Sequence, residues 1–401
     1  MKRTMMKSIV VRGSIAFMLL VSLTVKAQEQ TSETKEDDRF LISKYNAEKA
    51  FKPFIALETW GTYSIDNGNA TVETADRFDV SLRRFRFGTS GSPYSWLSYS
   101  FQLHADRLGE DNYAFTKGNY GGIDIWNAYL TAKLLKESEL LNLQAGYYWA
   151  AISRQYNTSP WAIGTFDKTR AGFYLRSFMT GKGNGIESGI GLGGLKNFDN
   201  FGISYRIGTY EPSAYAIRAN SGRLYTGRVM FSIGDPEQKK YKYMLSGNHW
   251  GKRTGITIGL GVSSQNNGKL TDTTAWDNSM AYGADILINY KGLHIDGEFY
   301  LMKRTADNVD DFDGSEFHLQ VGYNIPVEKT FVEPSFTYEK YEGEGNKSLF
   351  KQIGDDVTYD IGVNWYLDGQ KIKLSLHYVM QEGSISDALG DYIGTAFQIK
   401  L

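Results

Sequence analysis

The sequence has no cysteine, only five histidines, and none of the short motifs that mark a serine hydrolase elbow or a nucleotide-binding P-loop. Without cysteine, a disulfide scaffold and a metal site with thiolate ligands are excluded. The histidines lack the close spacing that a metal site on one element needs, and we expect most of them to be solvated side chains of strands. They are His104, His249, His294, His318 and His377. We therefore expect no cofactor, no metal and no catalytic site.

A long hydrophobic run is also missing after residue 27, so no transmembrane helix is predicted there. The mean hydropathy of −0.38 would ordinarily indicate a soluble protein. A membrane β-barrel gives a similar average, because its lipid-facing residues alternate with polar residues of the lumen. The composition agrees with a barrel: 27 tyrosines and 22 phenylalanines suit strands and interfacial aromatic girdles, and 43 glycines accompany only seven prolines.

The first 27 residues have the organisation of a secretory signal peptide. Four basic residues precede an apolar segment, residues 13–25, that is too short to span a bilayer, and Val25-Lys26-Ala27 fits a cleavage site. An uncleaved anchor would need about 20 apolar residues. We expect export and a mature chain that begins near Gln28. Residues 28–50 are predicted to be a polar periplasmic lead segment, and residues 51–401 a transmembrane barrel domain.

The balance of charge argues against nucleic acid as a partner. The signal contains five of the 44 basic residues and no acid, which leaves 39 basic and 45 acidic residues in the mature chain, a net charge of −6. A protein that binds nucleic acid would be expected to carry an excess of positive charge.

From Phe51 onward, segments of about ten residues alternate between apolar and polar side chains. In Leu97 to Asp106, leucine, tyrosine, phenylalanine and alanine occupy one face, and serine, glutamine, histidine and aspartate occupy the other. One face suits lipid and the other suits water. The same alternation recurs in residues 280–290, 316–325, 358–367 and 372–378. The pattern predicts an all-β fold, an antiparallel transmembrane β-barrel in the outer membrane that contacts lipid.

Seven short links alternate with longer polar connections, and we expect the short links at the periplasmic side. The number of strands follows from the segments that these connections separate. Counting every segment gives 17 strands, because Tyr241 to Trp250 and Gly255 to Ser264 look like two. Bacterial single-chain barrels have an even number of strands. We therefore treat this region as one spanning strand with a periplasmic extension, and predict 16 strands. The links are Gly91–Pro93, Lys136–Glu139, Lys196–Asn200, Asp235–Glu237, Lys291–Gly292, Pro326–Lys329 and Asp368–Gln370.

The third outer connection, Ala150 to Asn184, is the longest loop. We expect it to fold toward the lumen and narrow it; an external loop that caps the mouth is the alternative. Its aromatic residues have two readings, a stacking track for sugars or packing of the loop against the wall. These residues are Trp149, Tyr156, Trp161, Phe166 and Phe173.

Three strand patterns carry a family resemblance: Ser81 to Gly88 (SLRRFRFG), Ala128 to Leu130 followed by Gln144 to Tyr147, and Asp360 to Leu367. In these segments, and over most of Phe51 to Leu401, the chain resembles the phosphate-selective porin O and P family of Gram-negative outer membranes. The resemblance implies a 16-stranded, often trimeric porin, hence a homotrimer. It consists of strand-level patterns and does not define the substrate.

The family name implies phosphate, and basic residues occur where a lumen site would need them. The third outer connection contains Arg154, Lys168, Arg170, Arg176 and Lys182, and the next one contains Arg218 and Arg223. Arg84 and Arg86 alternate with Phe85 and Phe87, and they face the lumen if the rings face lipid. Such a cationic cluster would raise the local concentration of anions in a narrow lumen. We treat these nine residues as candidate pore-lining residues.

Acidic residues on lumen phases oppose this interpretation. They are Asp285, Asp296, Glu298, Glu316 and Asp360, and a further acidic outer loop contains Asp307, Asp310, Asp311 and Asp313. The lumen charge is therefore mixed. The sequence predicts a channel for small hydrophilic solutes and leaves open whether anions such as phosphate are preferred or whether the protein is a carbohydrate or general-diffusion porin.

The last strand, Gly394 to Leu401, has alternating apolar residues like the C-terminal signal read by the barrel-assembly machinery, although Leu401 stands where phenylalanine is commoner. An ordinary edge strand is the alternative. Three other classes of protein remain as alternatives for the whole chain: an outer-membrane barrel enzyme, which would need a serine and a histidine on the lipid-facing side, a structural barrel with a plugged lumen, and a soluble periplasmic sandwich. The alternation and the small polar lumen faces favour the porin.

Overall fold

The structure, a computed structural model, describes residues 45–65, 77–106, 108, 122–212, 222–269, 275–307, 309–383 and 390–401. The predicted signal peptide and most of the predicted lead segment lie outside these residues. The lead segment ends in a one-turn helix, α2 (Ala47–Ala50), capped by the Asn46 side chain. Within the described ranges, no helix is long and apolar enough to cross a membrane.

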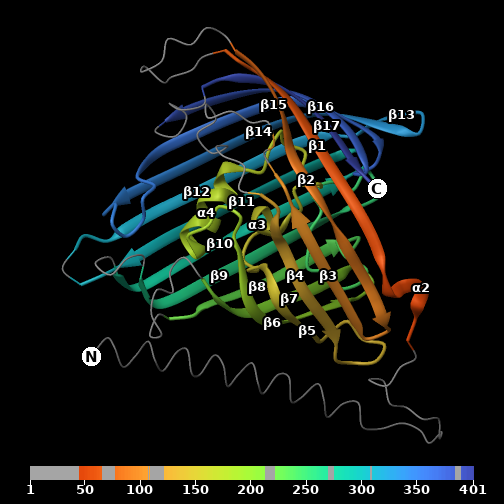
Figure 1. Ribbon diagram of the computed structural model, residues 1–401, viewed down its shortest axis with the longest axis horizontal. Helices are drawn as coiled ribbons and strands as arrows, with labels where there is room; N and C mark the ends of the chain where they lie inside the picture. The colour runs from red at the N-terminus through yellow and green to blue at the C-terminus, as the bar shows by residue number, and fades with distance from the viewer. Residues whose placement is uncertain are drawn as a thin grey trace, which may run out of the picture. The chain divides into compact units, whose positions relative to one another are not determined.

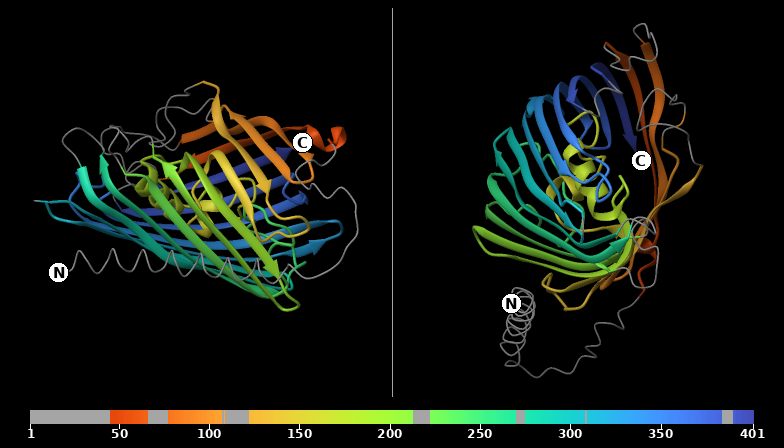
Figure 2. Two further views of the ribbon diagram at one scale, coloured as in Figure 1. Left: turned by 90° about the horizontal axis from the view of Figure 1, so that it is seen from below. Right: turned by 90° about the vertical axis from the view of Figure 1, so that its left-hand side faces the viewer.

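Antiparallel strands form one closed sheet, in which β1 pairs with both β2 and β17 (Figures 1 and 2). The strands that make up the described wall are β1 (Lys52–Ser64), β2 (Arg77–Tyr94), β3 (Leu97–His104), β4 (Asp124–Lys133), β5 (Asn142–Trp149), β6 (Ile186–Asn197), β7 (Phe201–Glu211), β8 (Leu224–Gly234), β9 (Gly255–Lys269), β10 (Ala275–Tyr290), β11 (Leu293–Thr305), β12 (Phe312–Tyr323), β14 (Thr330–Gly345), β15 (Gly354–Asp368), β16 (Ile372–Gly383) and β17 (Tyr392–Lys400). The predicted 16-stranded antiparallel barrel is confirmed. A three-residue strand, β13 (Ile325–Val327), only extends the hairpin to β14.

The alternation in the sequence becomes the two faces of the wall. On β9 and β10, Val262 is paired with Tyr282, and both are exposed on the outer face, as lipid contact requires. In the opposite phase, Ser263 and Asp285 are buried inside the barrel. A membrane barrel therefore buries its polar residues and exposes its apolar ones, the reverse of a soluble protein.

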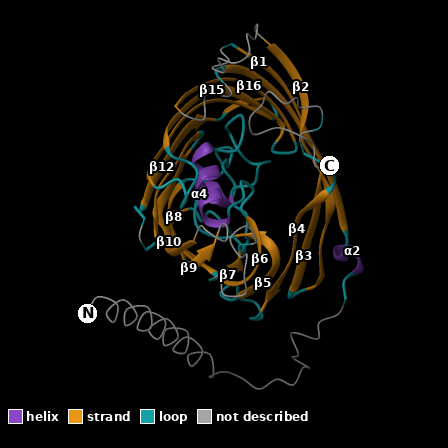
Figure 3. Cartoon of the chain, turned by 60° about the vertical axis from the view of Figure 1, so that its left-hand side comes forward, coloured by secondary structure: helices purple, strands orange, loops and turns teal. Residues whose placement is uncertain are grey.

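The connection between β5 and β6, residues 150–185 and here called L3, lies within the ring of strands (Figure 3). It contains two helices, α3 (Arg154–Asn157) and α4 (Arg170–Thr180). The Thr169 side chain accepts a hydrogen bond from the Gly172 N–H and starts α4. Gly181 ends α4 with φ of 74°, a left-handed conformation that glycine adopts without steric cost.

The connection between β8 and β9, residues 235–254 and here called T4, corrects one prediction. We expected Tyr241 to Trp250 to extend a spanning strand into the periplasm; this is wrong, because the segment is irregular and bonds to L3 inside the barrel. Its apolar phase, Tyr243 and Leu245, is buried. These side chains alternate with exposed Lys242 because they pack inside the barrel rather than against lipid.

Candidate functional site

The first half of L3 is fixed to two acidic side chains of β11. Ser153 Oγ donates to Glu298 at 3.1 Å, and the Gln155 backbone N–H donates to the same carboxylate at 2.8 Å. The Gln155 side-chain amide donates to Asp296 at 3.1 Å. Both carboxylates are buried. These two lumen acids therefore hold the loop and do not face water.

The second half of L3 is fixed by hydrogen bonds to acidic side chains of β14 and β15 and to an arginine of β11. The backbone N–H of Ala171, in the first turn of α4, donates to Glu339 at 3.0 Å, where a carboxylate is also favoured by the helix dipole. The Tyr174 hydroxyl donates to Asp356, and the guanidinium of Arg304 donates to the Phe178 carbonyl at the other end of α4.

Arg84 and Arg86 have their predicted phase, and both are buried with acidic partners. Arg84 pairs with Glu58 of β1 at 2.6 Å and with Asp167 of L3. Arg86 pairs with Asp106 at 2.7 Å. Its guanidinium carbon also lies 3.6 Å from the ring centroid of Trp126, a cation–π contact. Neither charge is free of a counter-charge.

Arg154 joins L3 to two other parts of the barrel. It donates to both carboxylate oxygens of Glu237 in T4, at 2.9 and 2.8 Å. Its Nε lies 3.5 Å from Asp285 of β10, which also binds Arg228 of β8. All four side chains are nearly inaccessible to solvent. Such an arrangement is structural, since buried charges must be paired.

Lys168, Arg170 and Arg176 are three further basic residues of L3. Lys168 donates to the carbonyls of Gln155 and Thr158, both at 2.6 Å, and ties the loop to itself. Burial, followed by the nearby Arg176 charge, lowers the pKa of Lys168. Arg176 is 6% exposed and forms no ion pair within the described part of the chain. Burial lowers its pKa to about 10, so it remains charged at neutral pH. Arg170 is partly exposed at the start of α4.

The remaining candidates lie apart from this group. Lys182 pairs with Glu187 at 3.2 Å and is 28% exposed. Arg223 pairs with Glu211, and both are more than half exposed. Arg218 lies outside the described residues. The nine candidates are therefore not one cluster. Arg84, Lys168 and Arg176 lie near enough for the two arginine charges to lower the pKa of Lys168, whereas Arg86, Arg154, Lys182 and Arg223 each pair with a different acid.

Sequence reasoning missed Arg83. The register of β1 and β2 shifts between Glu58, which is paired with Arg84, and Thr59, which is paired with Leu82, so Arg83 is the extra residue of a bulge. With this bulge, the two adjacent arginines both reach Asp167, at 2.9 Å for Arg83. The close spacing of Arg83, Arg84 and Arg86 in one strand was the signal available in the sequence. Glu237, Arg228 and Arg304 were also missed.

Asp167 is the acidic group of L3 that remains partly accessible, at 27% exposure. Burial alone would raise the pKa of this carboxyl, but the Arg83 and Arg84 guanidiniums hold it well below its usual range. The carboxylate therefore stays charged and is shared between two arginines.

The aromatic residues of L3 mostly pack the loop. Trp149, Tyr156, Trp161 and Phe166 are all at most 6% exposed. The Phe166 ring lies 4.4 Å from that of Trp60 on β1. Phe173 is partly exposed. The arrangement favours packing over a continuous stacking track.

The open part of the wall lies on β3 and β4. The inward side chains of β3 remain partly exposed along its length; they are Ser98, Ser100, Gln102 and His104. Their neighbours Trp126 and Tyr129 on β4 are also partly exposed. On the covered side, the inward residues of β11 are at most 3% exposed. The partly exposed inward side chains described here therefore lie on β3 and β4, strands on the side of the ring away from α4 in Figure 3.

A profile of the family described as phosphate-selective porin O and P matches residues 56–391, most of the chain. The chain belongs to this family. The porin is also 25% identical to an uncharacterised protein of Aquifex aeolicus over 391 residues, which covers 88% of this chain and 87% of the relative.

Solved structures of outer-membrane proteins share the fold. The anion-selective porin of Comamonas acidovorans matches with a TM-score of 0.56 and 14% identity, over 88% of this porin and 99% of that chain. OprB of Pseudomonas putida matches with a TM-score of 0.58 and 9% identity, over 88% of this porin and 95% of that chain. A trimer form of OmpT of Vibrio cholerae matches with a TM-score of 0.52 and 12% identity, over 88% of this porin and 99% of that chain. Family and fold together establish an outer-membrane channel for small solutes.

Proposed function

We propose that solutes pass between L3 and the lumen faces of β2 to β4, and that this passage prefers small anions such as phosphate. The observation that carries the proposal is the asymmetry of exposure: polar side chains of β3 are open to water, whereas those of β11 are sealed by L3. Water-lined polar walls are what a hydrophilic solute requires.

The preference for anions rests on the groups that border this space. Arg170 and Lys182 are partly exposed cations of L3, and Arg83 of β2 faces Asp167. Asp167 pairs with Arg83 and Arg84, and Glu58 also pairs with Arg84, so these four charges balance and the positive excess at this border rests on Arg170. A net positive potential in a narrow lumen concentrates anions.

Three further features belong to the proposal. The chain is exported with cleavage near Ala27, its C-terminal strand is read by the barrel-assembly machinery, and three copies assemble into a homotrimer. The trimer form of the structurally similar Vibrio protein supports the last of these. We also propose that the protein is a passive channel without catalytic activity.

Planar-bilayer recording of the purified mature porin tests the proposal. Under a KCl gradient, we expect a reversal potential of anionic sign and a current that falls when phosphate is added. Arg170→Gln should shift the reversal potential toward cations. Arg223→Gln is the matched control, because Arg223 is an exposed arginine paired on another connection. Conduction without anion preference would instead indicate a general-diffusion or carbohydrate porin, and a silent barrel would contradict the channel itself.

A further inference from the structure

We propose that T4 is a second luminal insert, which enters the barrel from the end opposite to L3 and sets the size limit of the channel. The proposal rests on the solute pathway described above. It concerns residues 236–253, which no strand of the barrel needs for its connection.

The ends of T4 already form a closed hairpin. Gly234 of β8 is paired with Gly255 of β9, and the Asp235 N–H donates to the Thr254 carbonyl at 2.8 Å. Elsewhere at this end of the barrel, two residues, Lys291 and Gly292, suffice to join β10 to β11. The chain between Asp235 and Thr254 is therefore an insertion rather than a turn required by the topology.

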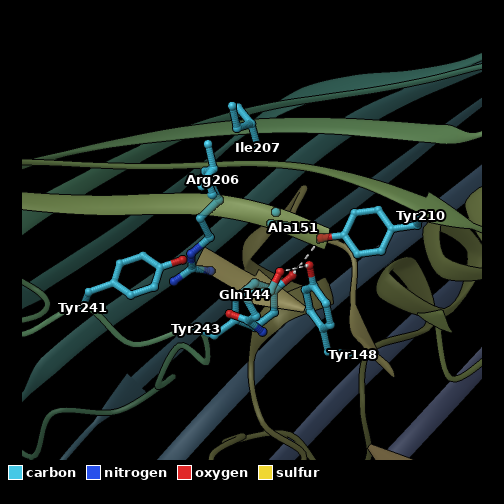
Figure 4. A pocket seen from close by; sticks show the side chains of 10 residues that line it. Gln144, Tyr148, Ala151, Arg206, Ile207, Tyr210, Tyr241 and Tyr243 are labelled. Carbon is cyan, nitrogen blue, oxygen red and sulfur yellow. Dashed lines mark hydrogen bonds between the residues drawn. The ribbon is translucent and has the colours of Figure 1, made fainter. Parts of the chain in front are cut away.

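T4 first packs on the wall formed by β5, β6 and β7. The Tyr243 hydroxyl donates to the Trp149 carbonyl, and its ring lies 5.3 Å from that of Tyr148. The Tyr241 hydroxyl lies where a Cβ at Gly193 would be, so glycine in β6 makes room for the insert. A cavity of about 10 Å³, which holds about one water, remains at this contact (Figure 4).

T4 then crosses the interior to the strands on the far side. Asn248 and the buried Asn324, which follows β12, exchange two side-chain hydrogen bonds of 2.9 Å. Asn248 also donates to Glu333 of β14 at 3.2 Å. The Trp250 ring contacts Tyr366 of β15 edge to face, with centroids 6.0 Å apart. The insert thus contacts the wall at β5–β7 and again at β12–β15.

In the middle of the lumen, T4 and L3 form one body. The Leu245 N–H donates to the Asn157 carbonyl and the Gly247 N–H to the Ala162 carbonyl, both at 3.1 Å. The bidentate pair of Arg154 and Glu237 joins the two inserts by side chains. Burial would raise the pKa of Glu237, but Arg154 lowers it to about 2, so the pair stays ionised at neutral pH.

The consequence is that two inserts, from opposite ends, close the lumen along β5 to β15 and leave the passage along β2 to β4. L3 alone would narrow the barrel only from its own end. T4 supports L3 through the pair of Arg154 and Glu237, which makes Glu237 a positioning residue. T4 also occupies part of the cross-section of the lumen that water would otherwise fill.

The direct test is excision of T4. Replacing residues 236–253 with Asn-Gly leaves Asp235 and Thr254 paired across a two-residue hairpin loop, so the register of β8 and β9 is preserved. We expect a higher single-channel conductance and entry of larger polyethylene glycols than in the wild type. The control removes Pro326, Val327, Thr330 and Phe331, which shortens the β13 hairpin at the same end by two pairs. It should conduct like the wild type.

An excised barrel that still shows heat-modifiable migration, and that conducts and excludes solutes like the wild type, would overturn the role of T4 without touching the proposed pathway. If the wild type itself never conducts, the proposed function fails instead. The absence of native cysteine provides a second test, which does not depend on folding of the excised variant.

In this second test, Ser246→Cys places one thiol on T4, at a partly exposed position between the two hydrogen bonds to L3. Labelling it with a bulky methanethiosulfonate should reduce the current through open channels. Lys329→Cys, on the exposed β13 hairpin, should accept the same label without loss of current. Complete labelling of Ser246→Cys with unchanged current would contradict the proposal.

Discussion

The lumen faces of β3 and β11 are built on the same alternation but have different surroundings. β3 presents small or neutral polar groups that remain partly exposed: Ser98, Ser100, Gln102 and His104. β11 presents larger and mostly charged groups that are at most 3% exposed: His294, Asp296, Glu298, Tyr300 and Arg304. L3 covers β11 and leaves β3 open.

The difference shows that charge on a lumen phase is not by itself a sign of ion selectivity. Burying a charge is costly unless a partner compensates it. On the covered side, the carboxylates of Asp285, Asp296 and Glu298 each bind a group of L3 or of a neighbouring strand. Those strands are therefore anchors for the inserts, and in the pathway we propose, selectivity is expected to depend on the few charges that border β2 to β4.

The largest expected effect is on the covered side. Asp285→Ala leaves two buried guanidiniums, Arg228 and Arg154, without this carboxylate. Breaking a buried pair in this way costs about 3–5 kcal/mol. The free energy of unfolding can be measured from the urea dependence of the heat-modifiable band, and it should fall by that amount.

Ser100→Ala is the matched change on the open side, where the side chain is partly hydrated. It should alter the free energy of unfolding by less than about 0.5 kcal/mol. Equal effects of the two substitutions would mean that the two sides of the lumen do not differ as described.

A smaller effect is expected at the element that separates the two sides. Thr169→Ala removes the hydrogen bond from the Gly172 N–H that starts α4 and should cost that helix about 1 kcal/mol. Because the barrel wall is unchanged, we expect noisier open-channel current and faster cleavage of L3 by added protease. Thr131→Ala on β4 is the control and should change neither; a quiet, protease-resistant Thr169→Ala channel would show that α4 is held by its wall contacts alone.

Much of the fold could be predicted because lipid and water impose a period of two on every spanning strand. The count of 16 was right, but one argument for it failed at Tyr241 to Trp250. There Tyr243 and Leu245 alternate with polar residues because they pack inside the barrel. Alternation reports which face is apolar, and it does not report whether lipid or another part of the protein covers that face.

The site was less predictable because its partners are remote in sequence. The alternation with Phe85 and Phe87 correctly predicted that Arg84 and Arg86 point to the inside of the barrel. No local pattern could pair Arg84 with Asp167, or Arg154 with Glu237, since 83 positions separate the residues of each pair. The position of Arg83 depends on a bulge, which shifts the alternation by one residue.

The smallest effect sharpens the comparison on the open side. Asp167→Asn removes a negative charge that borders the passage, and at roughly 6 Å in screened water one charge is worth about 0.4 kcal/mol. Preference for chloride over potassium should therefore rise about twofold. Glu211→Gln, an exposed acid paired with Arg223 on another connection, should leave this preference unchanged.

The dependence on pH follows from the same pair. Arg83 and Arg84 hold the pKa of Asp167 below its usual range, so the carboxylate keeps its charge as pH falls, and its pairing is lost only well below the ordinary value near 3.8. Reversal potentials of the wild type should show no contribution from Asp167 titration between pH 7 and pH 5. A wild-type preference that climbs to the Asp167→Asn value within that interval would mean that Asp167 takes up a proton there, and that the two arginines do not share it.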